Sequence, residues 1–235
     1  MKEKKSHIHP LHAVMYEAVQ IFEDLGFSVV AGPQMEDQWH NFDALNVPKD
    51  HPARDMQDTF FVPKKDDEGR PYVLRTHTSS VQIRYMENNQ PPFAIIVPGK
   101  VFRNEATDAT HEAQFHQIEG LMVGENITLA HLRGVLETFL KKFLGEETEM
   151  RFRPGFFPFV EPGVEVDIIF KEKWLELLGA GMVHPSVLES AGIDSKKYQG
   201  FAFGIGLDRL MMMKYGVSDV RYSYGGDARF NTSII

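Results

Sequence analysis

Two arginines and the polar residues near them are the side chains best suited to chemistry on an anionic substrate. The first arginine stands in VFRNE (101–105), which a polar loop separates from FHQIEG (115–120). If both runs are strands of one hairpin, alternation places Arg103 and Glu105 on one face, and Gln117 and Glu119 likewise share a face. A solvated sheet face is the alternative, since alternation most often turns polar side chains to water. Spacing alone does not decide between them.

The second arginine, Arg209, follows the glycine-rich run GFAFGIGLD (200–208). These glycines lack the G-x-G-x-x-G spacing and the βαβ setting of a dinucleotide fingerprint, which excludes that interpretation. Gly204 and Gly206 instead suggest that a ligand or a neighbouring strand approaches the backbone closely. An arginine in the first turn of a helix opposes the helix dipole, so Arg209 is expected to meet an anion. A surface arginine without function is the alternative.

The elements that must position these residues follow from apolar periodicity. It predicts helices at 11–25, 79–86, 129–143 and 207–214, and strands at 27–30, 60–62, 72–74, 93–97, 99–105, 114–123, 149–153, 164–170, 174–178 and 201–203. Residues 36–58 show no clear period and are expected to form a long ordered loop. Successive strands joined by hairpins indicate an α+β fold, a mainly antiparallel sheet flanked by helices.

Bulk composition limits the classes of protein that fit. The 235 residues, 43% of them hydrophobic, are expected to form one domain over 1–235. No apolar run approaches the roughly 20 residues of a membrane span, and the first residues lack the apolar core of a signal peptide, so we expect a cytoplasmic protein without membrane contact. The absence of cysteine excludes disulfides and cysteine-ligated metals but leaves histidine and carboxylate sites open. A net charge of −8 argues against a general RNA clamp.

Three weaker patterns are interpreted structurally. His7, His9 and His12 are expected to lie in a solvated tail rather than to bind metal. The histidine after His111-Glu112 stands at 116, one place too far for the H-E-x-x-H metalloprotease motif. Met211 to Met213 are expected to pack in the core.

Together, the segments above resemble the signature motifs of class II aminoacyl-tRNA synthetases: helix, strand and Pro33, then F-R-x-E, then the glycine-rich strand and helix with Arg209. From about His9 to Phe230, the chain resembles in order the α subunit of phenylalanyl-tRNA synthetase. The matching segments are HNFDALNVP, HPARDMQDTF, RTHTSS, VPGKVFRNEATDATHEAQFHQIEG, FFPFVEPG, WLELLGAGMVHP and GFAFGIGLDRL. The resemblance implies activation of L-phenylalanine with ATP and Mg²⁺, then transfer to the 3′ end of tRNA(Phe).

The resemblance also implies roles at the nucleotide. Arg103 would bridge the ATP α-phosphate and the amino acid carboxylate, where charge builds during attack on phosphorus. Phe115 and Arg209 would sandwich the adenine, with Arg209 also reaching the γ-phosphate. Glu105 and His111 would contact the nucleotide, over the backbone of Gly204 and Gly206. Arg103, Glu105 and Arg209 are the residues expected to be catalytic.

For the amino acid, the resemblance implies that Gln117 and Glu119 hold the ammonium group, with His77, Ser79 and Trp39 beside them. Ser79 and Gln82 also fit a helix-capping box, the interpretation favoured for Gln82. Phe157 and Phe159 would grip the phenylalanine ring edge to face, and Val160, Ala202 and Gly204 would line the rest of the pocket. An apolar pocket rejects an added hydroxyl only about a hundredfold, so discrimination against tyrosine is expected to be imperfect.

Magnesium prefers oxygen ligands. The resemblance implies Glu161 as a ligand, shared with a partner subunit, and Asp167 and Glu176 are weaker candidates. A surface carboxylate without a metal is the alternative for each.

The helix and strand before Pro33 correspond to the family's subunit interface, so a β subunit or a second copy of the chain is the expected partner. The family's N-terminal coiled-coil arm, editing module and anticodon-binding domain have no counterpart in the sequence, so transfer to tRNA is expected to need other parts. The alternatives are a paralogue that adenylates an amino acid without charging tRNA and a non-catalytic regulatory subunit. The presence of Arg103, Glu105 and Arg209 argues against the regulatory subunit.

Overall fold

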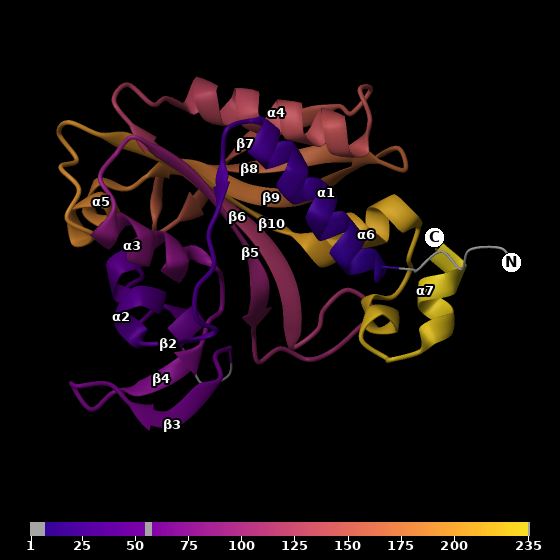
Figure 1. Cartoon of the computed structure of the whole chain (residues 1–235), viewed down its shortest axis with the longest axis horizontal. Coiled ribbons are helices and arrows are strands. Elements are labelled where there is room, and N and C mark those ends of the chain that lie inside the picture. Colours follow the sequence, from indigo (N-terminus) through magenta and orange to yellow (C-terminus); the bar gives the residue numbers. More distant parts are fainter. Residues whose placement is uncertain (1–7, 55–57, 235) are drawn as a thin grey trace, which may run out of the picture.

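The computed structural model describes residues 8–54 and 58–234, which are built around one seven-stranded sheet (Figure 1). The strand order is β1-β5-β6-β10-β9-β8-β7. All neighbours pair antiparallel except β1 with β5, so the predicted α+β fold is confirmed. The strands are β1 (Ser28–Val29), β5 (Phe93–Phe102), β6 (Gln114–Gly124), β7 (Met150–Phe157), β8 (Val160–Phe170), β9 (Lys173–Val183) and β10 (Gln199–Gly206).

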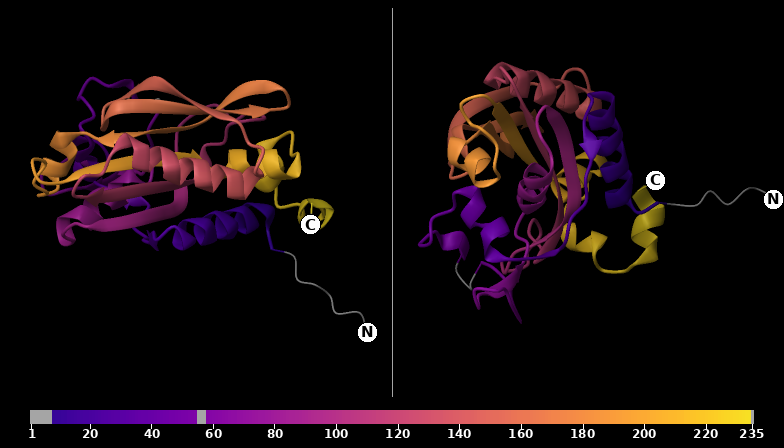
Figure 2. Two further views of the ribbon diagram at one scale, coloured as in Figure 1. Left: turned by 90° about the horizontal axis from the view of Figure 1, so that it is seen from above. Right: turned by 60° about the vertical axis from the view of Figure 1, so that its left-hand side comes forward.

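Two long helices, α1 (Pro10–Asp24) and α4 (Leu129–Leu144), lie side by side on one face of the sheet (Figures 1 and 2). Their apolar stripes close over the sheet through stacked aromatic rings. The ring of Phe22 in α1 lies 4.4 Å from that of Phe139 in α4 and 5.1 Å from that of Phe203 in β10, centroid to centroid. This core fixes the helices to the sheet because all three rings are buried.

The opposite sheet face is covered at one end by short elements. These are α2 (Gln38–Asn41), the 3₁₀ turn η1 (Asp43–Leu45), α3 (Ser79–Asn88) and α5 (Pro185–Ser190). Alternation along β5 and β6 separates the two faces: Ile96 and Ile118 belong to the core under α1 and α4, whereas Ile95 and Leu121 belong to the second core. The rest of this face is left for the site.

A second, three-stranded sheet of order β2-β4-β3 packs beside these elements. It consists of β2 (Met35–Glu36), β3 (Phe61–Lys65) and β4 (Pro71–Leu74), and the 3₁₀ turn η2 (Pro52–Arg54) lies between β2 and β3 in the sequence. After β10 the chain continues through α6 (Leu207–Tyr215), the 3₁₀ turn η3 (Val220–Ser223) and α7 (Ala228–Ile234). Among the described helices, none combines the length and apolarity needed to cross a bilayer.

Several sequence predictions are wrong in detail. Segment 36–58 is not a long loop, since its described part contains the end of β2 together with α2, η1 and η2. The strands predicted at 93–97 and 99–105 are one strand that ends at Phe102, which leaves Arg103 and Glu105 beyond it. Pro98 is tolerated because β1 pairs only with Ile95 and Ile96, so β5 is an edge strand at the proline. Strands β7, β8 and β9 are longer than predicted, and α5 was not predicted.

Candidate active site

A cavity of about 920 Å³ opens on the partly covered face of the sheet, and most residues singled out from the sequence line it. The two arginines, which come from segments far apart in the chain, both line this cavity. The lining residues that the sequence suggested are His77, Ser79, Arg103, Glu105, His111, Phe115, Gln117, Glu119, Phe157, Phe159, Val160, Glu176, Ala202, Gly204, Gly206 and Arg209. The cavity therefore brings together the two arginines, the polar pair on β6 and the aromatic turn of β7.

Glycines keep the floor of the cavity open. Gly204 of β10 stands opposite Glu119 of β6, and Gly206 stands opposite Gln117. A Cβ atom at Gly204 would lie 3.2 Å from Cγ of Glu119, inside the space above the carboxylate. The expectation that glycine here allows close approach to the backbone fits this geometry.

A buried carboxylate is the central polar group of the cavity. Glu119 is 5% exposed and accepts hydrogen bonds from the backbone N–H of Thr78 at 3.0 Å, the hydroxyl of Ser79 at 2.5 Å and the amide of Gln82 at 3.4 Å. Burial raises the pKa of Glu119, and the bonds from Ser79 and Thr78 and the nearby charge of Arg103 partly oppose that shift. A cation bound beside Glu119 would therefore stabilise the ionised form of this carboxylate.

The predicted capping box at the start of α3 is wrong. The N-cap residue is Thr78, and it makes no side-chain capping bond. Ser79 and Gln82 turn inward to Glu119 instead, because the buried carboxylate needs donors more than the helix start does. Gln82 therefore belongs to the site, a role that its spacing did not indicate.

Two polar atoms of the cavity have no hydrogen-bond partner among the described residues. They are the side-chain oxygen Oε1 of Gln117 and Nδ1 of His77, both buried. Burial, with the charge of Arg103 adding to it, lowers the pKa of His77 to about 3, so this imidazole is neutral at neutral pH. A buried polar atom without a partner costs about 1–3 kcal/mol, so a ligand that satisfies it gains affinity.

The other end of the cavity carries the arginines. Arg103 lies over the ring of Phe115 at 5.1 Å from its centroid and donates from Nε to the carbonyl of Thr76 at 3.3 Å. Arg209 donates from Nη1 to the carbonyl of Glu176 at 2.7 Å. His111 is held by Asp108 in an exposed loop at the cavity mouth. Flat cations beside an aromatic ring suit a ligand with both phosphates and a base.

The aromatic end is formed by the turn between β7 and β8. The rings of Phe157 and Phe159 lie 5.9 Å apart at an angle of 23°. A Cβ atom at Gly179 would come within 2.7 Å of Cζ of Phe157, so this ring rests directly on the sheet. Further apolar residues that the sequence did not single out complete this end, namely Leu45, Met86, Leu121, Val183 and Val187.

Three predicted site residues do not line the cavity: Trp39, Glu161 and Asp167. Trp39 packs edge to face against His40, with the ring centroids 4.8 Å apart. Glu161 is exposed and lies 3.4 Å from Nε2 of His184. Asp167 is buried, and Nε of Arg151 and of Arg153 donate to it at 2.7 and 2.6 Å.

The environment of Asp167 argues against the predicted metal role. The hydrogen bond from Arg153 is the main reason that its pKa lies below the ordinary range. With both neighbouring arginines bound to it, this carboxylate is neutralised inside the protein. Its role is to join β7 to β8.

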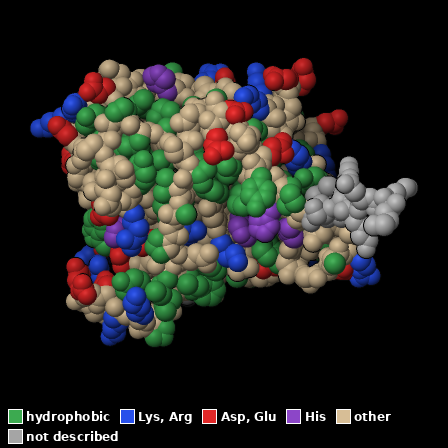
Figure 3. All heavy atoms as spheres, in the orientation of Figure 1, with side chains coloured by type: hydrophobic (Ala, Val, Ile, Leu, Met, Phe, Trp, Pro, Cys, Tyr) green, Lys and Arg blue, Asp and Glu red, His purple; other side chains and the backbone are tan. Residues whose placement is uncertain are grey.

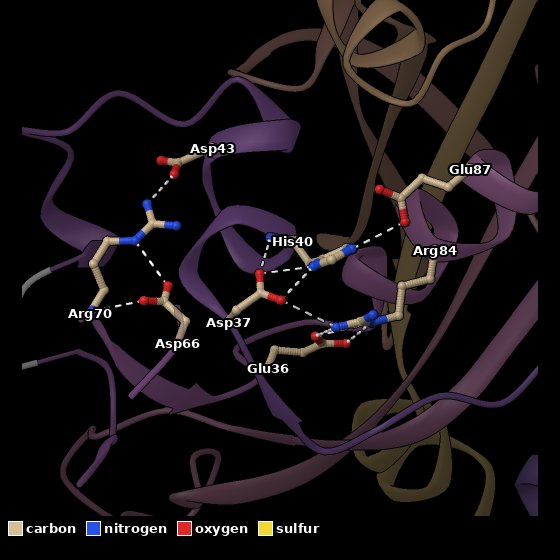
Figure 4. A network of polar contacts seen from close by, with 8 residues as sticks. All are labelled: Glu36, Asp37, His40, Asp43, Asp66, Arg70, Arg84 and Glu87. Atoms are coloured by element: carbon tan, nitrogen blue, oxygen red, sulfur yellow. Dashed lines mark hydrogen bonds and ion pairs between the residues drawn. The ribbon is translucent and has the colours of Figure 1, made fainter. Parts of the chain in front are cut away.

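Another carboxylate group near the site also has a structural explanation. Glu36, Asp37 and His40 offer ligand atoms within 4.8 Å of one another, a spacing that suits a metal ion. Arg84, however, pairs with Glu36 at 2.5 Å, and His40 bonds Asp37 (Figure 4). These bonds tie the segment around α2 to α3, and Ser79, Gln82 and Met86 of α3 line the cavity.

The fold and the cavity together define a class of protein, and comparison with known proteins agrees. The family described as tRNA synthetases class II core domain (F) matches residues 1–234. The crystal structure of pyrrolysyl-tRNA synthetase from Desulfitobacterium hafniense superposes with a TM-score of 0.70 at 18% identity, covering 94% of this chain and 74% of that one, which supports the fold.

Within this class, the chain belongs to the family of phenylalanine–tRNA ligase α subunits. It is 54% identical over 236 residues to that subunit of Dehalococcoides mccartyi, which covers 95% of this chain and 68% of the relative. It is 51% identical over 241 residues to that of Leptospira biflexa, covering 97% of this chain and 69% of the relative. The resemblance described from the motifs is confirmed.

Proposed function

We propose that this chain activates L-phenylalanine with ATP, forming phenylalanyl-adenylate and pyrophosphate, and delivers the phenylalanyl group to the 3′ end of tRNA(Phe). One observation carries the proposal. A buried carboxylate and an amide oxygen that has no partner among the described residues lie in the same cavity as two arginines and a pair of phenylalanine rings. The carboxylate and the amide oxygen suit the ammonium group of an amino acid, the arginines suit a triphosphate, and the rings suit an aromatic side chain.

The amino acid ammonium would bind between Glu119 and Oε1 of Gln117. The carboxylate provides the charge, and the amide oxygen provides an acceptor that lacks a partner in the described structure. The neutral imidazole of His77 adds no competing positive charge near the ammonium. The ring would then extend toward Phe157 and Phe159, where edge contacts add about 0.5–1.5 kcal/mol each beyond burial.

ATP would occupy the arginine end. An oxygen of the phenylalanine carboxylate attacks the α-phosphorus, and pyrophosphate leaves. Arg103 would stabilise the charge that builds at this phosphorus, while Arg209 and Phe115 would hold the base and the outer phosphates. Arg103 already stacks on Phe115, so adenine would replace the guanidinium on that ring face.

Magnesium fits the acidic rim of this end. Glu105 and Glu176 line the cavity and are exposed, which suits an ion that keeps waters and binds through one or two carboxylates and phosphates. The ion would neutralise charge on the leaving pyrophosphate. Glu161 stays a candidate only in a complex, because it lies outside the cavity lining of this chain.

The family assignment suggests the partners. A protein related to α subunits would pair with a β subunit, and the outer edge of β1 and the exposed part of α1, which include Val29 and Tyr16, are available for that contact or for a second copy. The net charge of −8 supports the view that a partner provides much of the tRNA binding. Such a protein would act in the cytoplasm, where translation takes place.

Phenylalanine-dependent exchange of pyrophosphate into ATP tests the proposal, on the chain alone and with its β subunit. We expect exchange with phenylalanine, and a loss of about a hundredfold or more in kcat for Arg103→Ala. Arg133→Ala is the matched control, since Arg133 is exposed on α4 and pairs only with Glu137 among the described carboxylates.

The exchange assay, together with a tRNA-charging assay on the complex, separates the alternatives. Exchange without charging of tRNA by the complex would favour a paralogue that only adenylates. No exchange in either setting would favour a regulatory subunit and overturn the proposal.

A further inference from the structure

Asp208 is a buried carboxylate next to Arg209 that the proposed reaction does not use. It is 6% exposed and lies at the edge of the cavity, in the first turn of α6. No cation pairs with it among the residues that the structure describes. Burial raises its pKa, and the hydrogen bonds that it accepts oppose this shift. Because burying a carboxylate costs free energy, a specific role is expected for Asp208.

The two oxygens of Asp208 bind two different parts of the chain. Oδ2 accepts from the backbone N–H of His116 at 2.7 Å, and Oδ1 accepts from the hydroxyl of Tyr224 at 2.6 Å. His116 stands in β6 between Phe115 and Gln117, both of which line the cavity. The carboxylate therefore links the start of α6 directly to the strand that carries the proposed adenine-stacking ring.

Tyr224 closes the link from the other side. Its ring stacks on that of His116 at an angle of 12°, and its hydroxyl lies 3.2 Å from Nδ1 of His116. Burial lowers the pKa of His116 to about 4, so the ring is neutral at neutral pH. The tautomer with its proton on Nδ1 can donate to the tyrosine oxygen while the tyrosine donates to Asp208.

The contacts continue to the start of α1. The ring of His116 packs edge to face with that of His12, and His12 packs likewise with His9. His9 caps α1 and bonds the carbonyl of Ser223 through Nε2 at 3.0 Å. Figure 3 shows histidine side chains gathered on this face near the start of α1. His9 is the N-cap of α1 and His12 lies within α1, although its side chain is exposed, so neither belongs to the tail predicted for them; His7 lies outside the described residues.

We propose that Asp208 and Tyr224 form a clamp that positions Arg209 against Phe115 for adenine binding. The proposal rests on the proposed function, because it assigns the ATP end of the same cavity. Asp208 is a positioning residue: it acts through the backbone of His116 and through its neighbour Arg209. The aromatic end lies at the turn between β7 and β8, and the side-chain hydrogen bonds and ring contacts of the clamp residues within the described structure go to His116 and to each other instead. The clamp should therefore matter for ATP and little for phenylalanine.

Two mild substitutions test the clamp. Tyr224→Phe removes one hydrogen bond and keeps the stacked ring, and Asp208→Asn removes the charge and keeps the shape. We expect each to weaken ATP binding by about 5- to 10-fold, less than the roughly 10- to 150-fold effect of losing a charged hydrogen bond to the ligand itself, because the clamp acts on ATP only through its neighbours. The KM for ATP in pyrophosphate exchange should rise in parallel, while the KM for phenylalanine stays within about twofold. Tyr222→Phe is the control, because Tyr222 lies in turn η3, whose C-cap is Tyr224, and is 58% exposed.

Calorimetric titration of each variant with ATP, without phenylalanine, separates the clamp from the overall reaction. A wild-type chain that binds ATP but shows no exchange would overturn the proposed function and leave the clamp testable. Equal loss of affinity for ATP and phenylalanine would indicate a merely structural role and overturn the clamp. So would unchanged ATP affinity in both variants, or an equal effect of Tyr222→Phe.

Discussion

Removing the negative charge of the buried Glu119 should have opposite effects on ligand binding and on stability. Glu119→Gln keeps the shape of the side chain and, with its oxygen at the position of Oε1, an acceptor for the N–H of Thr78. The new NH₂ group would take the place of Oε2, where the hydroxyl of Ser79 can rotate and Gln82 can turn its amide so that their oxygens accept from it. What disappears is the charge that, in the proposed function, faces the ammonium of phenylalanine. A charged hydrogen bond contributes about 1.5–3 kcal/mol, so phenylalanine affinity should fall about 10- to 150-fold.

Stability should change in the other direction. Because burial raises the pKa of Glu119, the ionised form destabilises the folded state at pH values above that pKa. Glutamine carries no charge and so removes this destabilisation. The melting temperature at pH 8 should therefore rise while phenylalanine binding weakens.

The assay is calorimetric titration with phenylalanine and with ATP, together with thermal unfolding. Glu137→Gln on the surface of α4 is the control for the same chemical change, and we expect no effect on either ligand. Unchanged phenylalanine affinity in Glu119→Gln, or an equal loss for ATP, would refute the placement of the ammonium at Glu119.

Further predictions concern the pocket, the pH dependence and the metal. Ala202→Gly should admit para-substituted phenylalanines in pyrophosphate exchange, and unchanged selectivity would show that Ala202 does not line the para position. Gly179→Ala should raise the KM for phenylalanine more than that for ATP, because the new Cβ would come within 2.7 Å of Cζ of Phe157; equal changes would contradict this. The KM for phenylalanine should rise as the pH falls, starting above the ordinary range of a glutamate, since protonation of Glu119 removes the charge that binds ammonium; a flat profile down to pH of about 5 would count against it. Asp167→Asn should lower the free energy of unfolding by only about 1 kcal/mol, because the arginine partners of Asp167 are partly exposed. The magnesium dependence of exchange should stay unchanged, and an altered dependence would restore Asp167 as a candidate ligand.

Much of the fold and site could be predicted because their signals are local. The apolar period of the long helices and the alternation along β6 predicted the layers and placed Gln117 and Glu119 on one face, which the structure confirms. The arginines were identifiable because their surroundings are unusual: a polar strand end for Arg103 and a helix start for Arg209.

The misses share a physical cause, since they depend on contacts between distant segments. The i, i+3 spacing of Ser79 and Gln82 predicted a cap, but the direction of both side chains is decided by Glu119 on another strand. The sequence analysis assigned no role to Asp208, because its partners His116 and Tyr224 come from distant segments that only the fold brings together. Asp167 was a candidate metal ligand from the sequence, but in the structure two arginines of β7 donate hydrogen bonds to its carboxylate.

A crystal structure with phenylalanine and a non-hydrolysable ATP analogue would test the central claim most directly. We predict the ammonium in hydrogen-bond contact with both Glu119 and Oε1 of Gln117, the amino acid ring beside Phe157, and the adenine between Phe115 and Arg209. Electron density for either ligand outside this cavity, or an ammonium group turned away from Glu119, would contradict the account.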